Sequence, residues 1–233
     1  MRPQSPSYQW HRVLNALQRR RYAAQVDRVY REIVAGWDQR GFVERFRRFW
    51  DPFPSDEAHK FLDLDLWFRE AVFRYFVSGA PQMGRDLRVL DLGAGTGYFL
   101  LVCRHFGHDV LGLDVADEPL YNECFHFFGL PRVEHRIEPM QPLPELPDRF
   151  DLVTAFMTCF NWYEDHRPWD VEAWTFFLND LRSRLSDRGR AVFKINLNPQ
   201  TGEYYSAEVR RTIASSPLFR AQFFLDYVFL SSR

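Results

Sequence analysis

Val89-Leu90-Asp91-Leu92-Gly93-Ala94-Gly95-Thr96-Gly97-Tyr98-Phe99 is the stretch that decides the fold of this 233-residue chain. A short apolar strand carrying one acid is followed by glycines at every second position, and then by apolar residues that begin a helix. Glycine adopts positive φ without a steric penalty and lets a ligand approach bare backbone. The stretch therefore predicts a strand-to-helix turn built around a cofactor.

A second carboxylate follows the next predicted strand. The apolar run Val110-Leu111-Gly112-Leu113 ends at Asp114, about twenty residues after Gly93. An acid at the end of a second parallel strand can accept hydrogen bonds from the hydroxyls of a ribose. The alternative is that Asp114 only caps the helix that follows.

The two strands belong to an alternation of strands and helices that begins at Leu87. We predict strands over residues 88–92, 109–114, 133–138, 150–156 and 189–195, helices over 97–106, 117–128, 169–185 and 203–215, and one or two closing strands between 218 and 230. Strands separated by helices form parallel βαβ units, so we expect an α/β fold with a doubly wound, mostly parallel sheet of the seven-stranded type.

The part of the chain before this alternation has a different pattern. Residues 1–85 repeat apolar side chains at three- and four-residue steps, which predicts helices. We therefore expect two parts, an N-terminal helical cap or lid over residues 1–85 and a core over residues 86–233. The cap has a net positive charge and the core a net negative charge.

Composition is that of an ordinary globular protein, with 46% hydrophobic and 26% charged residues. The three cysteines are odd in number and scattered, which argues against a disulfide framework and favours a reducing compartment. Their spacing to nearby histidines matches no common zinc pattern, so no metal is expected. Since no run of 18 uncharged apolar residues and no signal-like segment is present, we expect a cytoplasmic protein with no membrane partner.

The spacing of the glycines separates two possible cofactors. A dinucleotide fingerprint, G-x-G-x-x-G, needs a third glycine at position 98, which is tyrosine. Asp91 with Gly93, Gly95 and Gly97 instead resembles the D-x-G-x-G-x-G motif of class I (Rossmann-like) methyltransferases, which depend on S-adenosylmethionine (SAM). Over about residues 87–196 the resemblance extends to Asp114, a Leu-Pro loop, and the openings of strands four and five at Phe150-Asp151-Leu152-Val153 and Gly189-Arg190-Ala191-Val192-Phe193.

The resemblance implies roles in binding SAM around the first two strands. Asp91 would hold the ammonium group of the cofactor or the turn itself. Asp114 would accept both ribose hydroxyls, and a carboxylate makes stronger hydrogen bonds to them than a neutral group does. The backbone of the turn and of the second strand end supplies the remaining contacts, from Gly93, Ala94, Gly95, Gly97 and Val115.

The adenine and methionine ends of SAM are matched less closely. Many family members carry Asp-Ala after strand three, where this chain has Pro139 and Met140. The adjacent Glu138 is a candidate acceptor for the adenine amine, with Met140 against the ring. Phe156 follows strand four, where the family borders the methionine portion, and an aromatic face there attracts a sulfonium. Buried packing is the alternative explanation for Phe156.

Candidate catalytic residues follow the fourth strand, between Thr158 and His166. This segment lacks the Asn/Asp-Pro-Pro-Tyr motif of adenine and glutamine N-methyltransferases, and strand four ends without the metal-binding acid of catechol-type enzymes. His166 is a candidate general base because its ordinary pKa lies near neutral pH, although a loop histidine is often simply exposed. Asn161 and Tyr163 are candidates to orient an acceptor hydroxyl.

The predicted function is methyl transfer from SAM to a small-molecule or glycan acceptor, at oxygen and without a metal ion. One alternative is an RNA or protein methyltransferase that uses the basic N-terminal helices, although no nucleic-acid partner is expected. Another is a protein that binds SAM without turnover. The sequence leaves the oligomeric state open, a homodimer included.

Overall fold

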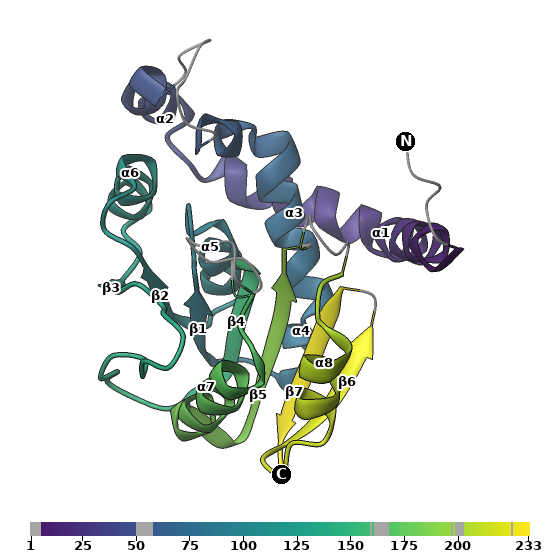
Figure 1. Ribbon diagram of the computed structural model, residues 1–233. Helices are drawn as coiled ribbons and strands as arrows, with labels where there is room; N and C mark the ends of the chain where they lie inside the picture. The colour runs from purple at the N-terminus through teal and green to yellow at the C-terminus, as the bar shows by residue number, and fades with distance from the viewer. Residues whose placement is uncertain are drawn as a thin grey trace. The chain divides into compact units, whose positions relative to one another are not determined.

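A computed structural model describes residues 6–49, 58–158, 160, 168–196, 198, 203–224 and 226–233 (Figure 1). The chain divides into two compact units, Met1–Pro81 and Gln82–Arg233. Within the described residues the first unit is helical, and every strand lies in the second. No helix in these ranges combines the length and apolar character that crossing a membrane requires.

The first unit is held together by contacts between its two longest helices. Tyr22 of one stacks on Phe76 of the other, with ring centroids 5.5 Å apart, and Arg19 forms an ion pair with Glu70 at 2.6 Å. Arg19, one of the basic residues of the N-terminal helices, thus pairs with an acid of the same unit. The elements of the unit are α1 (Pro6–Ala35), α2 (Gln39–Phe46), the 3₁₀ turns η1 (Arg47–Phe49) and η2 (Ala58–Leu62), and α3 (Leu64–Val77).

The second unit is built on one seven-stranded sheet in the order β3-β2-β1-β4-β5-β7-β6. The pairings from β3 to β5 are parallel, and β7 runs antiparallel to both β5 and β6. This arrangement confirms the predicted α/β fold with a mostly parallel seven-stranded sheet. The strands are β1 (Arg88–Leu92), β2 (Asp109–Asp114), β3 (Arg132–Glu134), β4 (Phe150–Thr158), β5 (Leu185–Ile195), β6 (Phe219–Phe224) and β7 (Tyr227–Ser232).

Helices cover both faces of the sheet. On one face, Trp174 and Leu181 pack in a buried cluster with inward-facing strand residues such as Leu90. On the other face, Phe99 meets Phe156 edge-on, with ring centroids 4.9 Å apart. In Figure 1, α7 and α8 lie in front of the sheet and α5 lies behind it. The helices of this unit are α5 (Tyr98–His105), α6 (Pro119–Phe128), α7 (Val171–Arg184) and α8 (Ala207–Ala214), and the short α4 (Ala80–Met83) spans the boundary between the units.

Several predicted boundaries are wrong. Strand β4 ends at Thr158 and not at residue 156, β5 begins at Leu185 and not at residue 189, and α8 begins at Ala207 and not at residue 203. Two further ends have a visible cause. The third strand ends at Glu134, and not at residue 138, because its one neighbour β2 also ends there: Asp114 pairs with Glu134. Helix α7 ends at Arg184 because Leu185 is fully buried and starts β5 by pairing with Phe150.

The strand order reverses between β1 and β4. The chain leaves β1 toward β2, which lies on one side of β1 in the sheet, and β4 lies on the other side of β1. Ligands of open α/β sheets bind outside the carboxyl ends of the strands at such a switch point. A bulge also lies here, where the register shifts between Phe156 and Thr158 and Met157 has φ of +62°. Bulges and positive φ at a non-glycine residue are frequent beside functional sites.

Candidate active site

The turn after β1 uses bare backbone. Gly93, Gly95 and Gly97 have φ of +68°, +56° and +75°, a region that other residues rarely adopt. A β-carbon on Gly93 would lie 2.8 Å from the Cγ2 atom of Thr158, closer than non-bonded carbons approach. The N–H of Gly93 donates to the carbonyl of Leu113 at 2.8 Å, which ties the turn to β2. The turn therefore offers backbone groups at the switch point, as the sequence predicts.

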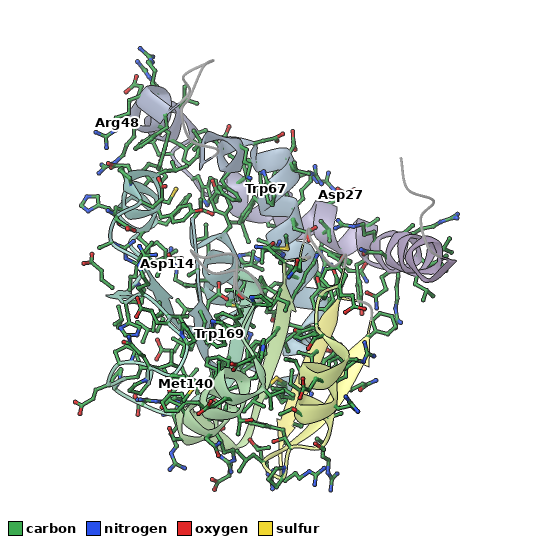
Figure 2. The ribbon with its side chains drawn as sticks, viewed as in Figure 1. Asp27, Arg48, Trp67, Asp114, Met140 and Trp169 are labelled. Carbon is green, nitrogen blue, oxygen red and sulfur yellow. The ribbon has the colours of Figure 1, made fainter. Side chains whose placement is uncertain are left out.

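Asp114 ends β2 beside this turn and is only 8% exposed (Figure 2). Its carboxylate accepts hydrogen bonds from the N–H groups of Gly95 at 2.5 Å and Val115 at 2.7 Å. Burial raises the pKa of Asp114, while these two backbone N–H groups oppose the increase. Each carboxylate oxygen has a second lone pair, so the group retains capacity for two ligand hydroxyls.

The structure rejects the capping alternative for Asp114. Helix α6 begins at Pro119, and its N-cap is Glu118, whose carboxylate accepts from the N–H of Leu120 at 3.2 Å. Asp114 is thus not required to cap this helix. A buried carboxylate beside a glycine turn fits a ligand that supplies hydroxyl donors.

Asp91 is buried inside the sheet at the carboxyl end of β1. The hydroxyl of Thr154, its register partner on β4, donates to Asp91 Oδ1 at 2.6 Å. This bond joins the two strands on either side of the switch point. It fixes the Asp91 carboxylate near the end of β1, the strand that leads into the glycine turn.

Thr158 is a residue that the sequence analysis did not assign to the site. Its side chain faces Gly93 and is 8% exposed, and its hydroxyl has no hydrogen-bond partner among the residues that the structure describes. Buried hydroxyls are normally satisfied, so an orphan hydroxyl beside the turn points to a ligand atom as its partner. Sequence reasoning could have identified Thr158 from its place at the end of strand four, next to the strand that carries the glycine turn.

The residues predicted to contact the adenine and methionine ends of SAM lie in different surroundings. Met140 has φ of +62° and is 46% exposed (Figure 2), and Gln141 donates to Glu138 Oε2 at 2.5 Å. Glu138 does not end a strand, since β3 stops earlier. Phe156 is buried and packs edge-on against Phe99 and Tyr227. Its buried packing is therefore observed, and roles in cofactor binding for these three residues stay predictions.

The predicted catalytic residues His166, Tyr163 and Asn161 lie outside the described residues. On either side of them, the N–H of Trp169 donates to the carbonyl of Phe160 at 2.9 Å. The two rings also stack, with centroids 4.5 Å apart and planes 15° from parallel. The described ends of this connection thus meet at the carboxyl end of β4.

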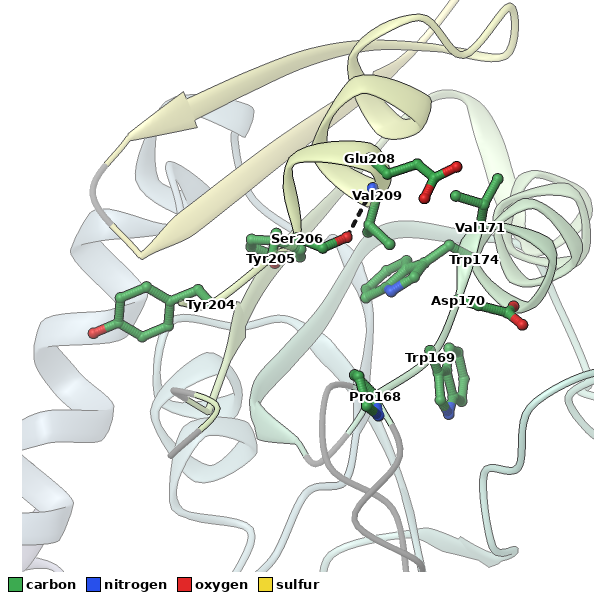
Figure 3. Close-up of a pocket in the computed structure, with 10 residues that line it drawn as sticks. All are labelled: Pro168, Trp169, Asp170, Val171, Trp174, Tyr204, Tyr205, Ser206, Glu208 and Val209. Atoms are coloured by element: carbon green, nitrogen blue, oxygen red, sulfur yellow. Dashed lines mark hydrogen bonds between the residues drawn. The ribbon is translucent and has the colours of Figure 1, made fainter. Parts of the chain in front are cut away.

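A pocket of about 220 Å³ lies between the first turns of α7 and α8 (Figure 3). These turns follow the loops that leave the carboxyl ends of β4 and β5. Asp170 caps α7 by accepting from the N–H of Ala173 at 2.9 Å, and Ser206 caps α8 by accepting from Val209 at 3.1 Å. This α7–α8 pocket is lined by Pro168, Trp169, Asp170, Val171, Trp174, Tyr204, Tyr205, Ser206, Glu208 and Val209.

The glycine turn, the buried Asp114 and the orphan hydroxyl of Thr158 fit SAM at the switch point of the sheet. When bound, SAM supplies an electrophilic methyl group on a sulfonium. Fold and site define a class I methyltransferase that depends on SAM.

Comparison with known proteins places the chain in a family. It belongs to the methyltransferase domain family, whose profile matches residues 47–214 and so begins within the helical unit. Over 120 residues the chain is 31% identical to the ubiquinone biosynthesis O-methyltransferase of Sinorhizobium fredii. That match covers 48% of each chain, so the protein spans about half the length of this curated relative.

Solved structures share the fold. DesVI from Streptomyces venezuelae is similar with a TM-score of 0.56 and 13% identity, covering 77% of this chain and 99% of the other. A TehB-like SAM-dependent methyltransferase from Corynebacterium glutamicum has a TM-score of 0.53 and 16% identity, covering 76% and 96%. At these identities the similarity is evidence for the fold alone.

Proposed function

We propose that this methyltransferase acts on a hydroxyl of a small molecule or a glycan, without a metal ion. The observation that carries the proposal is the α7–α8 pocket, which combines four aromatic side chains with two carboxylates at the carboxyl end of the sheet. Apolar walls with a few polar groups are typical of small-molecule sites. The relative from Sinorhizobium fredii is named an O-methyltransferase, which supports oxygen as the acceptor atom.

The cofactor roles in this proposal follow the contacts of the turn. Asp114 accepts the ribose hydroxyls, and the backbone of Gly93, Gly95 and Gly97 faces the amino-acid end of SAM. The hydroxyl of Thr158 forms a hydrogen bond with the same ligand. Support comes from the burial of Asp114 and Thr158 and from the positive φ of the three glycines.

A reaction without a metal is supported by the side chains at the strand ends. β4 ends at Thr158 and β5 at Ile195, neither of which is a carboxylate. Among the described residues, no three His, Cys, Asp or Glu side chains gather in a way that would hold an ion. His166 remains the proposed base, with Asn161 and Tyr163 as proposed orienting groups.

The test is formation of S-adenosylhomocysteine (SAH) from SAM with panels of hydroxylated small molecules, glycans, RNA and proteins, with and without a chelator. We expect turnover with a hydroxylated small molecule or glycan and no effect of the chelator. His166→Asn should abolish turnover and leave SAH affinity unchanged. Turnover of RNA or protein alone, or SAM binding with no product from any panel, would reject the proposed acceptor class.

A further inference from the structure

We propose that Arg132 is a positioning residue for the cofactor site, whose buried guanidinium keeps Asp114 in the charged form that accepts the ribose hydroxyls. The inference rests on the proposed role of Asp114, since Arg132 acts through this carboxylate and not on the cofactor itself. Its basis is the place of Arg132 in the sheet, the hydrogen bonds of its side chain, and the charges around Asp114.

Arg132 and Asp114 lie on the same face of the sheet. In the parallel pair of β2 and β3, Gly112 is the register partner of Arg132, and Asp114 is that of Glu134. Side chains alternate along a strand, so positions 112, 114, 132 and 134 share one face. A β-carbon on Gly112 would lie 2.6 Å from the Cζ atom of Phe125, so α6 covers this face. With strands about 4.8 Å apart and a rise of about 3.3 Å per residue, the Cα atoms of Arg132 and Asp114 are about 8 Å apart.

The guanidinium of Arg132 is held near the level of Asp114 in the sheet. Its Nη2 atom donates to Asn122 Oδ1 of α6 at 2.6 Å and to Glu134 Oε1 at 2.9 Å. Because Glu134 is the register partner of Asp114, the second bond places the guanidinium toward the carboxyl end of β2. The guanidinium also lies over the ring of Phe125, 5.2 Å from its centroid. These contacts fix the cation in one position beside the end of the strand.

The positive charge of Arg132 is buried and only partly compensated. Its side chain is 9% exposed, and its Nη1 atom has no hydrogen-bond partner among the described residues. Its ion-pair partner Glu134 is 62% exposed, so water screens that negative charge. A guanidinium stays charged at any pH at which a protein is folded, and a buried cation is favoured by a buried anion nearby. The buried carboxylate of Asp114 is such an anion.

The groups around Asp114 act on its charge in opposite directions. Burial raises the pKa of Asp114, and the negative charge of Asp117 raises it further, whereas two backbone N–H groups and the positive charge of Arg132 lower it. The elements beside Asp114 carry four further acids, which are Asp91 of β1, Glu118 and Glu123 at the start and in the middle of α6, and Glu134 of β3. Acids oppose a second negative charge, so ionisation of Asp114 depends on donors and cations.

Arg132 is the cation placed to act on Asp114. Helices α5 and α6 run back from the carboxyl ends of their strands, so the cations of β1, α5 and α6 stand toward the amino-terminal edge of the sheet; they are Arg88, Arg104, His105 and His126. Beyond β3, Arg136 is exposed and pairs with Asp117 at 2.6 Å. His135 donates its backbone N–H to the carbonyl of Asp114 at 2.9 Å, a bond that does not use its ring. Removing the charge of Arg132 should therefore let Asp114 bind a proton at higher pH.

The test follows the titration of the Asp114 carboxyl group in the full chain. The aspartate carboxyl carbons are labelled with ¹³C, and the Asp114 resonance is assigned from its absence in Asp114→Asn. Arg132→Gln removes the charge but keeps an N–H donor. We expect this variant to raise the titration midpoint of Asp114 by about one pH unit, the scale of one opposite charge at about 8 Å.

The affinity for SAH reports the consequence for the cofactor site. Calorimetric titrations across both midpoints should give equal Kd values for Arg132→Gln and the wild type at pH above both midpoints. Below both midpoints, Arg132→Gln should bind SAH about tenfold more weakly, which corresponds to a difference of about one pH unit between the midpoints. Arg132→Lys keeps a positive charge and should return the midpoint and the affinity toward the wild type, which a purely structural role of the guanidinium does not predict.

Two variants serve as matched controls. Arg104→Gln also removes an arginine that contacts α6, but this arginine binds the carbonyls at the end of that helix far from Asp114. His135→Gln removes the titratable ring next to the end of β3. Both should leave the Asp114 midpoint unchanged. If Arg132→Gln does not fold, Arg132→Met gives the same test with an apolar side chain in place of the charge.

The inference is overturned if loss of the Arg132 charge leaves the Asp114 midpoint unchanged, if either control moves the midpoint as far, or if Arg132→Lys behaves as Arg132→Gln does. Failure of the proposed role of Asp114 looks different. In that case Asp114→Asn binds SAH as tightly as the wild type at every pH, although the carboxyl midpoint still moves in Arg132→Gln.

Discussion

Replacing Asp114 by asparagine separates a ribose-binding carboxylate from a merely structural one. Hydrogen bonds to a charged group contribute about 1.5–3 kcal/mol, against about 0.5–1.5 kcal/mol for neutral pairs. Asparagine keeps one acceptor oxygen but presents an NH₂ group to the second ribose hydroxyl. We therefore expect SAH affinity to fall by about 2–3 kcal/mol, which is about 30- to 150-fold in Kd.

The assay is calorimetric titration of SAH into Asp114→Asn and into a control, Asp109→Asn. Asp109 is exposed at the opposite end of the same strand β2, so its substitution should leave the affinity unchanged. Asp114 also holds the N–H of Gly95, and the variant loosens that contact as well. Adenosine and 2′,3′-dideoxyadenosine distinguish loss of the ribose contact from loosening of the turn. Only loss of the ribose contact makes the drop in affinity depend on the ribose hydroxyls.

Asp114→Asn should remove the preference for adenosine over its dideoxy analogue. An equal loss for both nucleosides would show that Asp114 acts only on the turn, and unchanged SAH affinity would refute the ribose role altogether. The pH dependence gives a second check. Burial raises the pKa of Asp114, so its carboxylate is protonated at a higher pH than that of an ordinary aspartate. The affinity for SAH should therefore begin to fall at that higher pH as the solution is acidified, and this fall should be absent in Asp114→Asn.

Three further predictions concern the turn and the stability of the second unit. Gly93→Ala and Gly129→Ala both place a side chain at positive φ, which should cost each variant about 1–2 kcal/mol in thermal unfolding, and the contact with Thr158 should make the loss larger for Gly93→Ala. Only Gly93→Ala should lose SAH binding, because its β-carbon meets a side chain at 2.8 Å while that of Gly129 meets nothing, and equal binding by both variants would contradict this. Burial lowers the pKa of His108 below its ordinary value of 6.5, so the unfolded chain binds a proton before the native one does. The free energy of unfolding should therefore fall as the pH drops from about 6.5 toward the pKa of His108 in the native chain. If denaturant titrations of His108→Gln show the same dependence on pH, His108 is excluded as its cause. Asp226→Asn removes the carboxylate 3.3 Å from the buried ammonium of Lys194 and should cost about 3 kcal/mol in urea unfolding, most of it recovered by adding Lys194→Met. A loss below about 1 kcal/mol would show that the pair behaves as a surface pair.

The glycine turn and the carboxylates beside it were predictable because their signals are local. Strand, acid and alternating glycines lie within eleven residues, and the geometry at Gly93 and Gly97 follows from what only glycine can adopt. Asp114 was predicted from its place at the end of the next strand, and the structure ends β2 at this residue. The alternation of strands and helices likewise predicted the parallel sheet and its order of elements.

The proposed acceptor pocket was not predictable in the same way. Trp169 and Tyr205 come from loops after two different strands, and no spacing in the sequence links them. The orphan hydroxyl of Thr158 depends on its orientation toward Gly93, which only the folded sheet fixes. An aromatic residue in such a loop looks the same in the sequence whether it packs in the core or lines a pocket.

Element boundaries failed where tertiary pairing decides them. β3 stops at Glu134 because the strand beside it ends, although the residues that follow remain compatible with a strand. Leu185 has a helical neighbourhood but enters β5 because it is buried against Phe150. Neither partner is adjacent in sequence, so periodicity alone cannot place these ends.

The most direct measurement is a crystal structure of the chain grown with SAH. We predict one SAH molecule per chain at the turn after β1, with both ribose hydroxyls within hydrogen-bond distance of Asp114. Density for SAH elsewhere, or a turn that stays empty while the same crystals accept NAD, would contradict the assignment of this turn as the SAM site.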